Sequence, residues 1–165
     1  MEEWHDFFLA AAGAAAVLAG LVFVGVSINL EMIMADPTYG LVNRALEALI
    51  LLMAVLIATC LLLVPDQGTM VAGVEVLTVG VIDWAGIVAI QLLQLRNWHS
   101  LEASLRWHLV PRVVLGQVAT LPMVAAGIAV LSWGVSGLYV LVAGVVLSFL
   151  VAVGDAWVLL VEIKR

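Results

Sequence analysis

Residues 46–64 read LEALILLMAVLIATCLLLV, and the only charged side chain in this run is Glu47. About 20 apolar residues in a helix cross the ~30 Å hydrocarbon core of a bilayer. The run does not alternate between apolar and polar residues, as the ~10-residue strands of a transmembrane barrel do. A helix satisfies its own backbone hydrogen bonds, which lipid cannot do. The stretch therefore predicts a membrane-spanning helix.

Similar apolar stretches lie on both sides of this run. The chain is 65% hydrophobic and only 11% charged, whereas a soluble domain is about 25% charged. Connections rich in Pro and Gly separate the stretches. The sequence predicts an all-α fold, a polytopic transmembrane helical bundle that forms one domain over residues 1–165. Its five spans are predicted at about 7–33, 43–64, 70–95, 111–133 and 137–161.

The basic residues indicate an orientation for this bundle. Cytoplasmic loops of membrane proteins carry an excess of Lys and Arg. With the N-terminus outside and the C-terminus in the cytoplasm, every basic side chain falls on the cytoplasmic side. They are Arg44, Arg96, Arg106, Arg112, Lys164 and Arg165. The first residues, MEEWHDFF, are acidic where a signal peptide is basic, so we expect the first span to be retained.

The third connection has a pattern of its own, because residues 97–109 read NWHSLEASLRWHL. Its apolar residues recur at helical spacing, and Glu102 and Arg106 form an i,i+4 pair. We predict a short amphipathic helix at about 98–109 on the cytoplasmic face of the membrane. A solvent-facing linker helix is the alternative.

Acidic side chains within the spans are the strongest functional signal. Placing an Asp at the centre of a membrane helix costs about 2.5–3.5 kcal/mol on insertion scales. Asp83 lies near the middle of the third span, with Glu75 on an adjacent part of the same face, and Gln91 and Gln94 continue a polar track. One hypothesis is a hydrated ion or proton route. The alternative is helix–helix hydrogen bonding, with Asp83 donating to a carbonyl, although such contacts average only about 0.6 kcal/mol.

Other polar residues lie near the predicted cytoplasmic ends of the spans. Asp155 and Gln117 fall at similar depth, which predicts a hydrogen bond between the fourth and fifth spans. Arg112 is an alternative partner for Asp155. Glu47 lies three residues after Arg44, so we expect an interfacial ion pair that contributes little to stability. Asp155 and Gln117 remain candidates for an ion pathway, although a structural role is favoured.

Small residues recur along the first span. Gly13, Gly20 and Ser27 are spaced by seven residues, and Asn29 and Glu31 follow them. Small residues let membrane helices approach closely, so packing within the chain is the favoured interpretation. The alternative is a subunit seam or pore wall, in which a ring of carboxylates would favour cations.

The residues that would support other chemistry are missing or far apart. His5 is predicted on one side of the membrane and His99 and His108 on the other, and Cys60 is the only cysteine. The chain has no HExxH, GxSxG or P-loop motif. We therefore expect no enzyme activity, no metal site and no cofactor. The few scattered basic residues do not form a nucleic-acid-binding surface.

Residues 5–31, HDFFLAAAGAAAVLAGLVFVGVSINLE, together with NRALEALILL (43–52) and DAWVLLVEIKR (155–165), resemble a group of uncharacterised bacterial membrane proteins, largely actinobacterial. Some members carry an automatic label as modulators of the FtsH protease. The resemblance covers most of the chain and brings no catalytic or binding residues. We expect a multi-pass protein of the bacterial plasma membrane.

A second resemblance concerns the first two spans. AGLVFVGVSINLE (19–31) and LMAVLIATCLLLVP (52–65) are similar to the first two spans of Orai-type calcium channels. In that family the first span lines a hexameric pore with an acid at its outer mouth. Here Glu31 is predicted at the inner end, and the five spans and external N-terminus also depart from that pattern.

Two functions follow as hypotheses. The first is an oligomeric channel-like or ion-permeation protein, with Asp83 and the polar track as its site. A homo-oligomer is expected because so small a chain has few helices with which to enclose a conduit. The second is an accessory or regulatory subunit of a larger membrane complex, for example a membrane protease or a respiratory assembly.

Overall fold

The computed structural model describes residues 2–35, 40–96 and 103–162 of the chain, and these residues form helices and turns without any strand. The principal helices are α1 (His5–Ile28), α2 (Leu30–Ala35), α3 (Leu41–Leu62), α4 (Thr69–Arg96), α5 (Ala103–Trp133) and α6 (Leu138–Glu162). Short 3-10 helices precede α1 at Glu2–Trp4 (η1) and join α5 to α6 at Gly134–Gly137 (η3). The all-α fold class is therefore confirmed.

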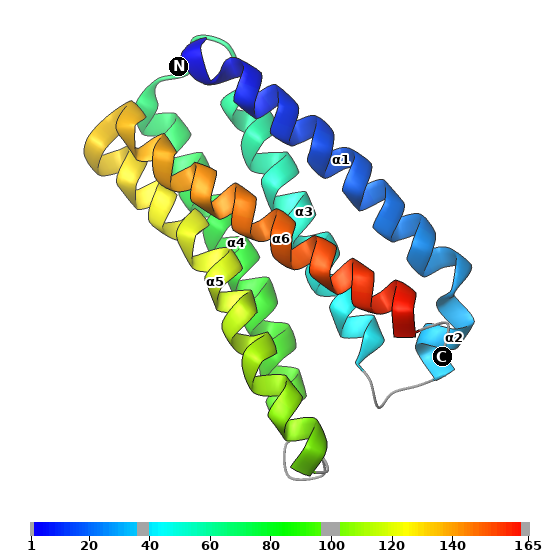
Figure 1. Cartoon of the computed structure of the whole chain (residues 1–165). Helices are drawn as coiled ribbons and strands as arrows, with labels where there is room; N and C mark the ends of the chain where they lie inside the picture. Colours follow the sequence, from blue (N-terminus) through cyan, green and yellow to red (C-terminus); the bar gives the residue numbers. More distant parts are fainter. Residues whose placement is uncertain (1, 36–39, 97–102, 163–165) are drawn as a thin grey trace.

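The five long helices form an antiparallel bundle (Figure 1). α4 packs along α5, α5 packs along α6, and α3 contacts α1, α4 and α6. Because α3 is surrounded on several sides, many of its residues are fully buried, including Leu51, Leu52, Val55 and Ala58. α1 begins at the opposite end of the bundle from the end of α6 (Figure 1).

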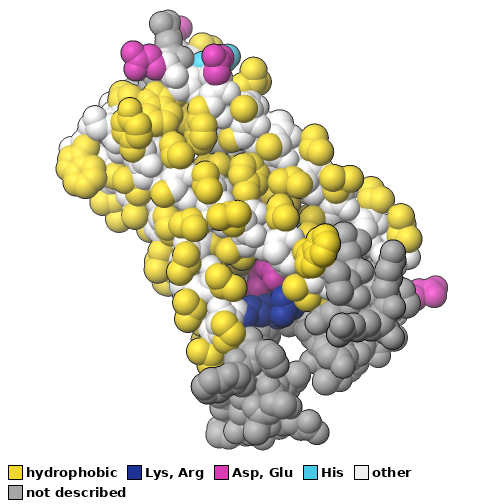
Figure 2. Space-filling view, in the orientation of Figure 1, with side chains coloured by type: hydrophobic (Ala, Val, Ile, Leu, Met, Phe, Trp, Pro, Cys, Tyr) yellow, Lys and Arg dark blue, Asp and Glu magenta, His cyan; other side chains and the backbone are white. Residues whose placement is uncertain are grey.

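The face of the bundle that Figure 2 shows is largely apolar. Large hydrophobic side chains with more than half of their surface exposed occur on α1, α4 and α6, among them Leu21, Ile82 and Leu150. Soluble monomers rarely expose continuous apolar patches of this kind. Lipid, in contrast, is a suitable solvent for such a surface, as expected for an integral membrane protein.

Four helical segments in the described residues are long and apolar enough to cross a membrane: His5–Ile28, Leu41–Leu62, Thr69–Gln94 and Val110–Leu159. The last segment contains the predicted span 111–133 and all but the last two residues of the predicted span 137–161. The two helices in this segment, α5 and α6, are joined by η3. Gly134 adopts a φ of 65° at this reversal, a conformation that glycine adopts without steric strain. α5 and α6 then lie side by side.

Two predicted boundaries are wrong. The first span was placed at 7–33, but α1 ends at Ile28, and the chain resumes as the short α2 after Asn29. The amphipathic helix predicted at 98–109 is not separate, because α5 begins at Ala103 and continues through Pro111 and Pro122 to Trp133. Helices in membranes tolerate proline where neighbouring groups satisfy the freed carbonyl. Residues 97–102 of that prediction lie outside the described residues.

Close backbone contacts hold α4 against α5. A Cβ atom added at Gly127 would lie 2.5 Å from the backbone N and Cα atoms of Leu77, and one at Gly80 would lie 2.9 Å from the backbone N of Val124. Any larger residue at these positions would push the helices apart. Small residues allow this approach between membrane helices, so these glycines set the spacing of α4 and α5.

Candidate functional site

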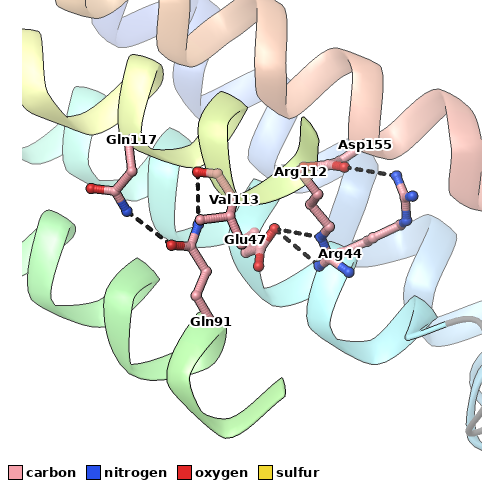
Figure 3. Close-up of polar contacts among 7 residues, drawn as sticks. All are labelled: Arg44, Glu47, Gln91, Arg112, Val113, Gln117 and Asp155. Atoms are coloured by element: carbon pink, nitrogen blue, oxygen red, sulfur yellow. Dashed lines mark hydrogen bonds and ion pairs between the residues drawn. The ribbon is translucent and has the colours of Figure 1, made fainter. Parts of the chain in front are cut away.

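A buried ion pair joins α3 to α5 (Figure 3). Arg112 Nη2 lies 2.9 Å from Glu47 Oε2, and Arg112 Nε donates a hydrogen bond of 3.0 Å to the same oxygen. Both side chains are less than 10% exposed. A buried charge of this kind is tolerated only when it is paired. Each of the two residues therefore compensates the buried charge of the other.

A second ion pair joins α3 to α6. Arg44 Nη1 donates a hydrogen bond of 3.2 Å to Asp155 Oδ1. Arg44 is more exposed than its partner, with 23% of its side chain accessible. Figure 3 shows the two ion pairs side by side, so that two arginines and two acids form one cluster without net charge. Figure 2 shows acidic and basic side chains together in a recess between α5 and α6.

These pairings differ from the predicted ones. We expected Glu47 to pair with Arg44, and Asp155 to bond with Gln117 or Arg112. The structure pairs Glu47 with Arg112 and Asp155 with Arg44. The reason is that α3 lies between α1, α4 and α6 and also approaches α5, so Arg44 and Glu47 reach partners on different helices.

The amide side chains of α4 and α5 form a hydrogen-bonded chain. Trp84 Nε1 donates to Gln117 Oε1 at 2.8 Å, and Gln117 Nε2 donates to Gln91 Oε1, also at 2.8 Å. Gln91 Nε2 donates in turn to the carbonyl of Val113 at 3.4 Å. The absence of a side chain at Gly116 leaves room for the Gln91 amide. Gln91 and Gln117 therefore join α4 to α5 by the helix–helix hydrogen bonding that was the alternative to an ion route.

Asp83 differs from every group described so far. It is 3% exposed, and neither carboxylate oxygen has a hydrogen-bond partner. Residues three and four positions away share its helix face. On that face Gly80 contacts the α5 backbone, and Ile87 packs in the core cluster with Leu51 and Ala119. Asp83 therefore points into the bundle, and the predicted alternative, a hydrogen bond to a neighbouring carbonyl, is wrong.

The other residues of the predicted polar track do not form one continuous set of contacts. Glu75 accepts a hydrogen bond from Gln67, which lies in the turn between α3 and α4. The side-chain nitrogen of Gln94 is buried without a partner. Gln91 belongs to the amide chain with Gln117. The third span thus carries polar groups along its length, but Asp83 is isolated from the others by at least one helical turn.

The small residues that recur every seven positions in α1, Gly13, Gly20 and Ser27, lie on its outer side. Nothing lies within 4 Å of a Cβ atom built at Gly13 or Gly20. Ser27 and Glu31 are exposed, while Ser27 Oγ donates to the Phe23 carbonyl and Asn29 Nδ2 to the Gly25 carbonyl. Packing within the chain instead uses other residues of α1, chiefly Phe8, Ala11, Ala12, Ala15, Ala19 and Val22. The favoured packing interpretation is therefore wrong for Gly13 and Gly20.

The two sets of predicted site residues do not come together. α1 packs on α3 with a smaller contact on α6, whereas α4 packs on α5 and α3. The outer side of α1, with Gly13 and Gly20, is separated from Asp83 by the bundle core. Within one chain, the two sets of residues therefore do not share a face.

Sequence reasoning missed the ion pairs of Arg112 with Glu47 and of Arg44 with Asp155. It also missed the hydrogen bonds of Gln117 with Trp84 and Gln91. Trp84 did stand out as an aromatic residue far from the interfacial positions that Trp favours. Arg112 and Glu47 both lie near the predicted cytoplasmic ends of their spans, so matched depth was an available signal. Depth alone does not show which of several polar residues at the same level are partners.

Within the part of the chain that the structure describes, no three His, Cys, Asp or Glu residues come close enough to hold a metal ion. No family model matches this chain, and no curated protein or solved structure matches it.

Proposed function

We propose that this protein is a non-enzymatic integral membrane protein that lets an ion cross the bilayer, and that permeation depends on Asp83. The observation that supports this proposal is the isolation of the Asp83 carboxyl. Among the residues that the structure describes, it is the buried acid for which neither oxygen has a partner.

Three other acids within the helices, in contrast to Asp83, have polar partners. Glu47 and Asp155 are paired with arginines from other helices, and Glu75 accepts a hydrogen bond from Gln67. Each of these three contributes to packing. Asp83 carries the insertion cost of an acid, about 2.5–3.5 kcal/mol, and makes no polar contact in return. Ionisable residues inside membranes mark ion pathways and proton relays. Such a role would explain an acid that makes no contribution to packing.

Five crossings are part of this proposal. α5 has 31 residues and α6 has 25, and ~20 residues are enough to span the hydrocarbon core. Their antiparallel arrangement supports two crossings by the segment Val110–Leu159. Arg44 near the start of α3 and Arg96 at the end of α4 lie toward the same end of the bundle, which favours a cytoplasmic C-terminus. The resemblance to bacterial membrane proteins favours the plasma membrane of a bacterium.

Self-association through α1 is the second part of the proposal. The outer side of α1 presents Gly13 and Gly20 with open space around them, and small residues of this kind support helix–helix contacts between membrane proteins. Asp83 lies inside the bundle, so each subunit would carry its own ion site. The oligomer would then stabilise the subunits and would not form the pore at their common axis.

An accessory or regulatory subunit of a larger membrane complex is the alternative function. It is favoured by the same open side of α1, which another protein would cover equally well. It is also favoured by the use of Glu47, Asp155, Gln91 and Gln117 in contacts between helices. In that case Asp83 would be dispensable for ion movement.

The mass and composition of the particle gently solubilised from native membranes separate these functions. Native mass spectrometry is expected to find a homogeneous homo-oligomer, and the purified particle is expected to conduct ions after reconstitution in liposomes. A stoichiometric complex with other proteins would favour the accessory role. A particle that contains only one copy of the chain would contradict self-association.

A further inference from the structure

We infer that the ion handled at Asp83 is a proton and not a metal cation. This inference rests on the proposed function and specifies its substrate.

The first argument is the number of available ligands. Ca²⁺ takes 6–8 oxygen ligands, and Mg²⁺ requires near-ideal octahedral coordination. Asp83 provides one carboxyl group, and neither of its oxygens has a hydrogen-bond partner. The residues three and four positions away on the same face of α4, Val79, Gly80, Gly86 and Ile87, offer no side-chain oxygen. A proton, in contrast, needs a single acceptor oxygen.

The second argument is space. A hydrated cation brings its own oxygen ligands but needs a water-filled cavity around it. One turn from Asp83 the α4–α5 contact leaves no such space, because even one added carbon at Gly80 would lie 2.9 Å from the Val124 nitrogen and 3.0 Å from the Met123 carbonyl carbon. The bundle does contain a cavity of about 210 Å³, but it is lined by apolar residues of α1, α2, α3 and α6 and does not include Asp83.

The third argument concerns the charges on the elements around Asp83. On α3 and α5 the charged groups nearest the core, Glu47 and Arg112, neutralise each other. On α4 itself Glu75 is eight residues away, which corresponds to about 12 Å along the helix. No fixed countercharge contacts Asp83 in the described residues, so an ionised carboxylate would have no compensation. Binding one proton removes that charge. The reaction is the formation and later cleavage of one O–H bond, and the same proton is taken up and released.

Ion selectivity in liposomes tests this inference with the full-length chain. One set of liposomes contains a pH-sensitive dye, and a potential set by potassium and valinomycin drives proton uptake. A second set without ionophore contains dyes for sodium and potassium. We expect proton uptake by the wild type, loss of this uptake to the level of protein-free liposomes in Asp83→Asn, and no sodium or potassium uptake.

The control variant is Asp66→Asn. Asp66 lies exposed in the turn after α3 with a φ of 57°, and asparagine tolerates this left-handed conformation. Asp66→Asn should therefore conduct protons as the wild type does, and Asp83→Glu should retain part of the uptake. Each variant is first shown to be monodisperse and helical, so that loss of uptake is not loss of fold.

The outcomes distinguish the two levels of the account. Sodium or potassium uptake that Asp83→Asn abolishes would overturn the proton inference and leave the proposed function intact. Proton uptake that persists in Asp83→Asn would overturn both the inference and the dependence of permeation on Asp83. If the wild type takes up no cation of any kind, the proposed function itself fails, and the inference fails with it.

Discussion

Arg112 on α5 holds Glu47 on α3 through two contacts to one carboxylate oxygen, at 2.9 Å from Nη2 and 3.0 Å from Nε. The two residues are 65 positions apart in sequence and are both buried, so the pair fixes α3 relative to α5. Removing one member of such a pair leaves an uncompensated charge, at a cost of about 3–5 kcal/mol. We expect Glu47→Gln to lower the melting temperature in detergent clearly, as measured by circular dichroism.

A double-mutant cycle separates this ion pair from other effects of the substitution. Glu47→Leu with Arg112→Leu removes both charges together, so the double variant should lose less stability than the sum of the two single variants. Strictly additive losses would show that the two side chains do not interact in the folded protein.

The pair of Arg44 with Asp155 should contribute less. Arg44 is 23% exposed and its contact with Asp155 is longer, at 3.2 Å. Water would therefore partly solvate Arg44 when Asp155 is replaced. Asp155→Asn is therefore expected to lower the melting temperature by less than Glu47→Gln in the same detergent. The reverse order would mean that the more exposed pair is the principal support of the bundle.

Neutralising Asp83 should have the opposite effect on stability. Its carboxyl is buried without a partner, so Asp83→Asn removes an acid that no contact compensates. The melting temperature of Asp83→Asn should equal or exceed that of the wild type. Glu47→Gln is the matched control, since it also replaces a buried carboxyl by an amide of similar shape. A large loss of stability in Asp83→Asn would indicate an undetected structural partner.

Two glycines provide a test of the contact between α4 and α5. A Cβ atom at Gly127 would collide with the Leu77 backbone, whereas one at Gly154 on α6 has nothing within 4 Å. Gly127→Ala should destabilise the protein by about 1–3 kcal/mol through overpacking. Gly154→Ala should instead stabilise it by about 0.5–1 kcal/mol, because alanine restricts the unfolded chain more. Chemical unfolding in mixed micelles measures both, and equal stabilities would argue against the close approach.

Self-association through α1 is testable in the same way. A leucine at Gly20 projects into open space, so Gly20→Leu should leave the fold of each subunit unchanged while blocking close contact between neighbouring α1 helices. Light scattering after size-exclusion chromatography should then report a smaller particle than for the wild type. Gly154→Leu, also on an open surface, is the control. An oligomer unaffected by Gly20→Leu would place the subunit contact elsewhere.

Composition and hydropathy were sufficient to predict an all-helical membrane bundle, because the backbone of every apolar span must satisfy its own hydrogen bonds in lipid. The level of a residue along its helix could also be predicted, since it follows from position in the sequence. The pairing of Glu47 with Arg112 could not, because it depends on how each helix is rotated about its axis. The unbroken course of α5 from Ala103 was missed as well, since Pro111 suggested a helix start. The isolation of Asp83 depends on how α4 is rotated about its axis. Two close contacts between α4 and α5, at Gly80 and at Gly127, determine this rotation.

The most direct test of the central claim is the rate of cation flux into liposomes that contain folded Asp83→Asn, compared with wild type and Asp66→Asn. We predict that wild type and Asp66→Asn conduct at the same rate and that Asp83→Asn does not conduct above protein-free liposomes. Equal flux in all three proteins would contradict the assignment of Asp83 as the residue on which permeation depends.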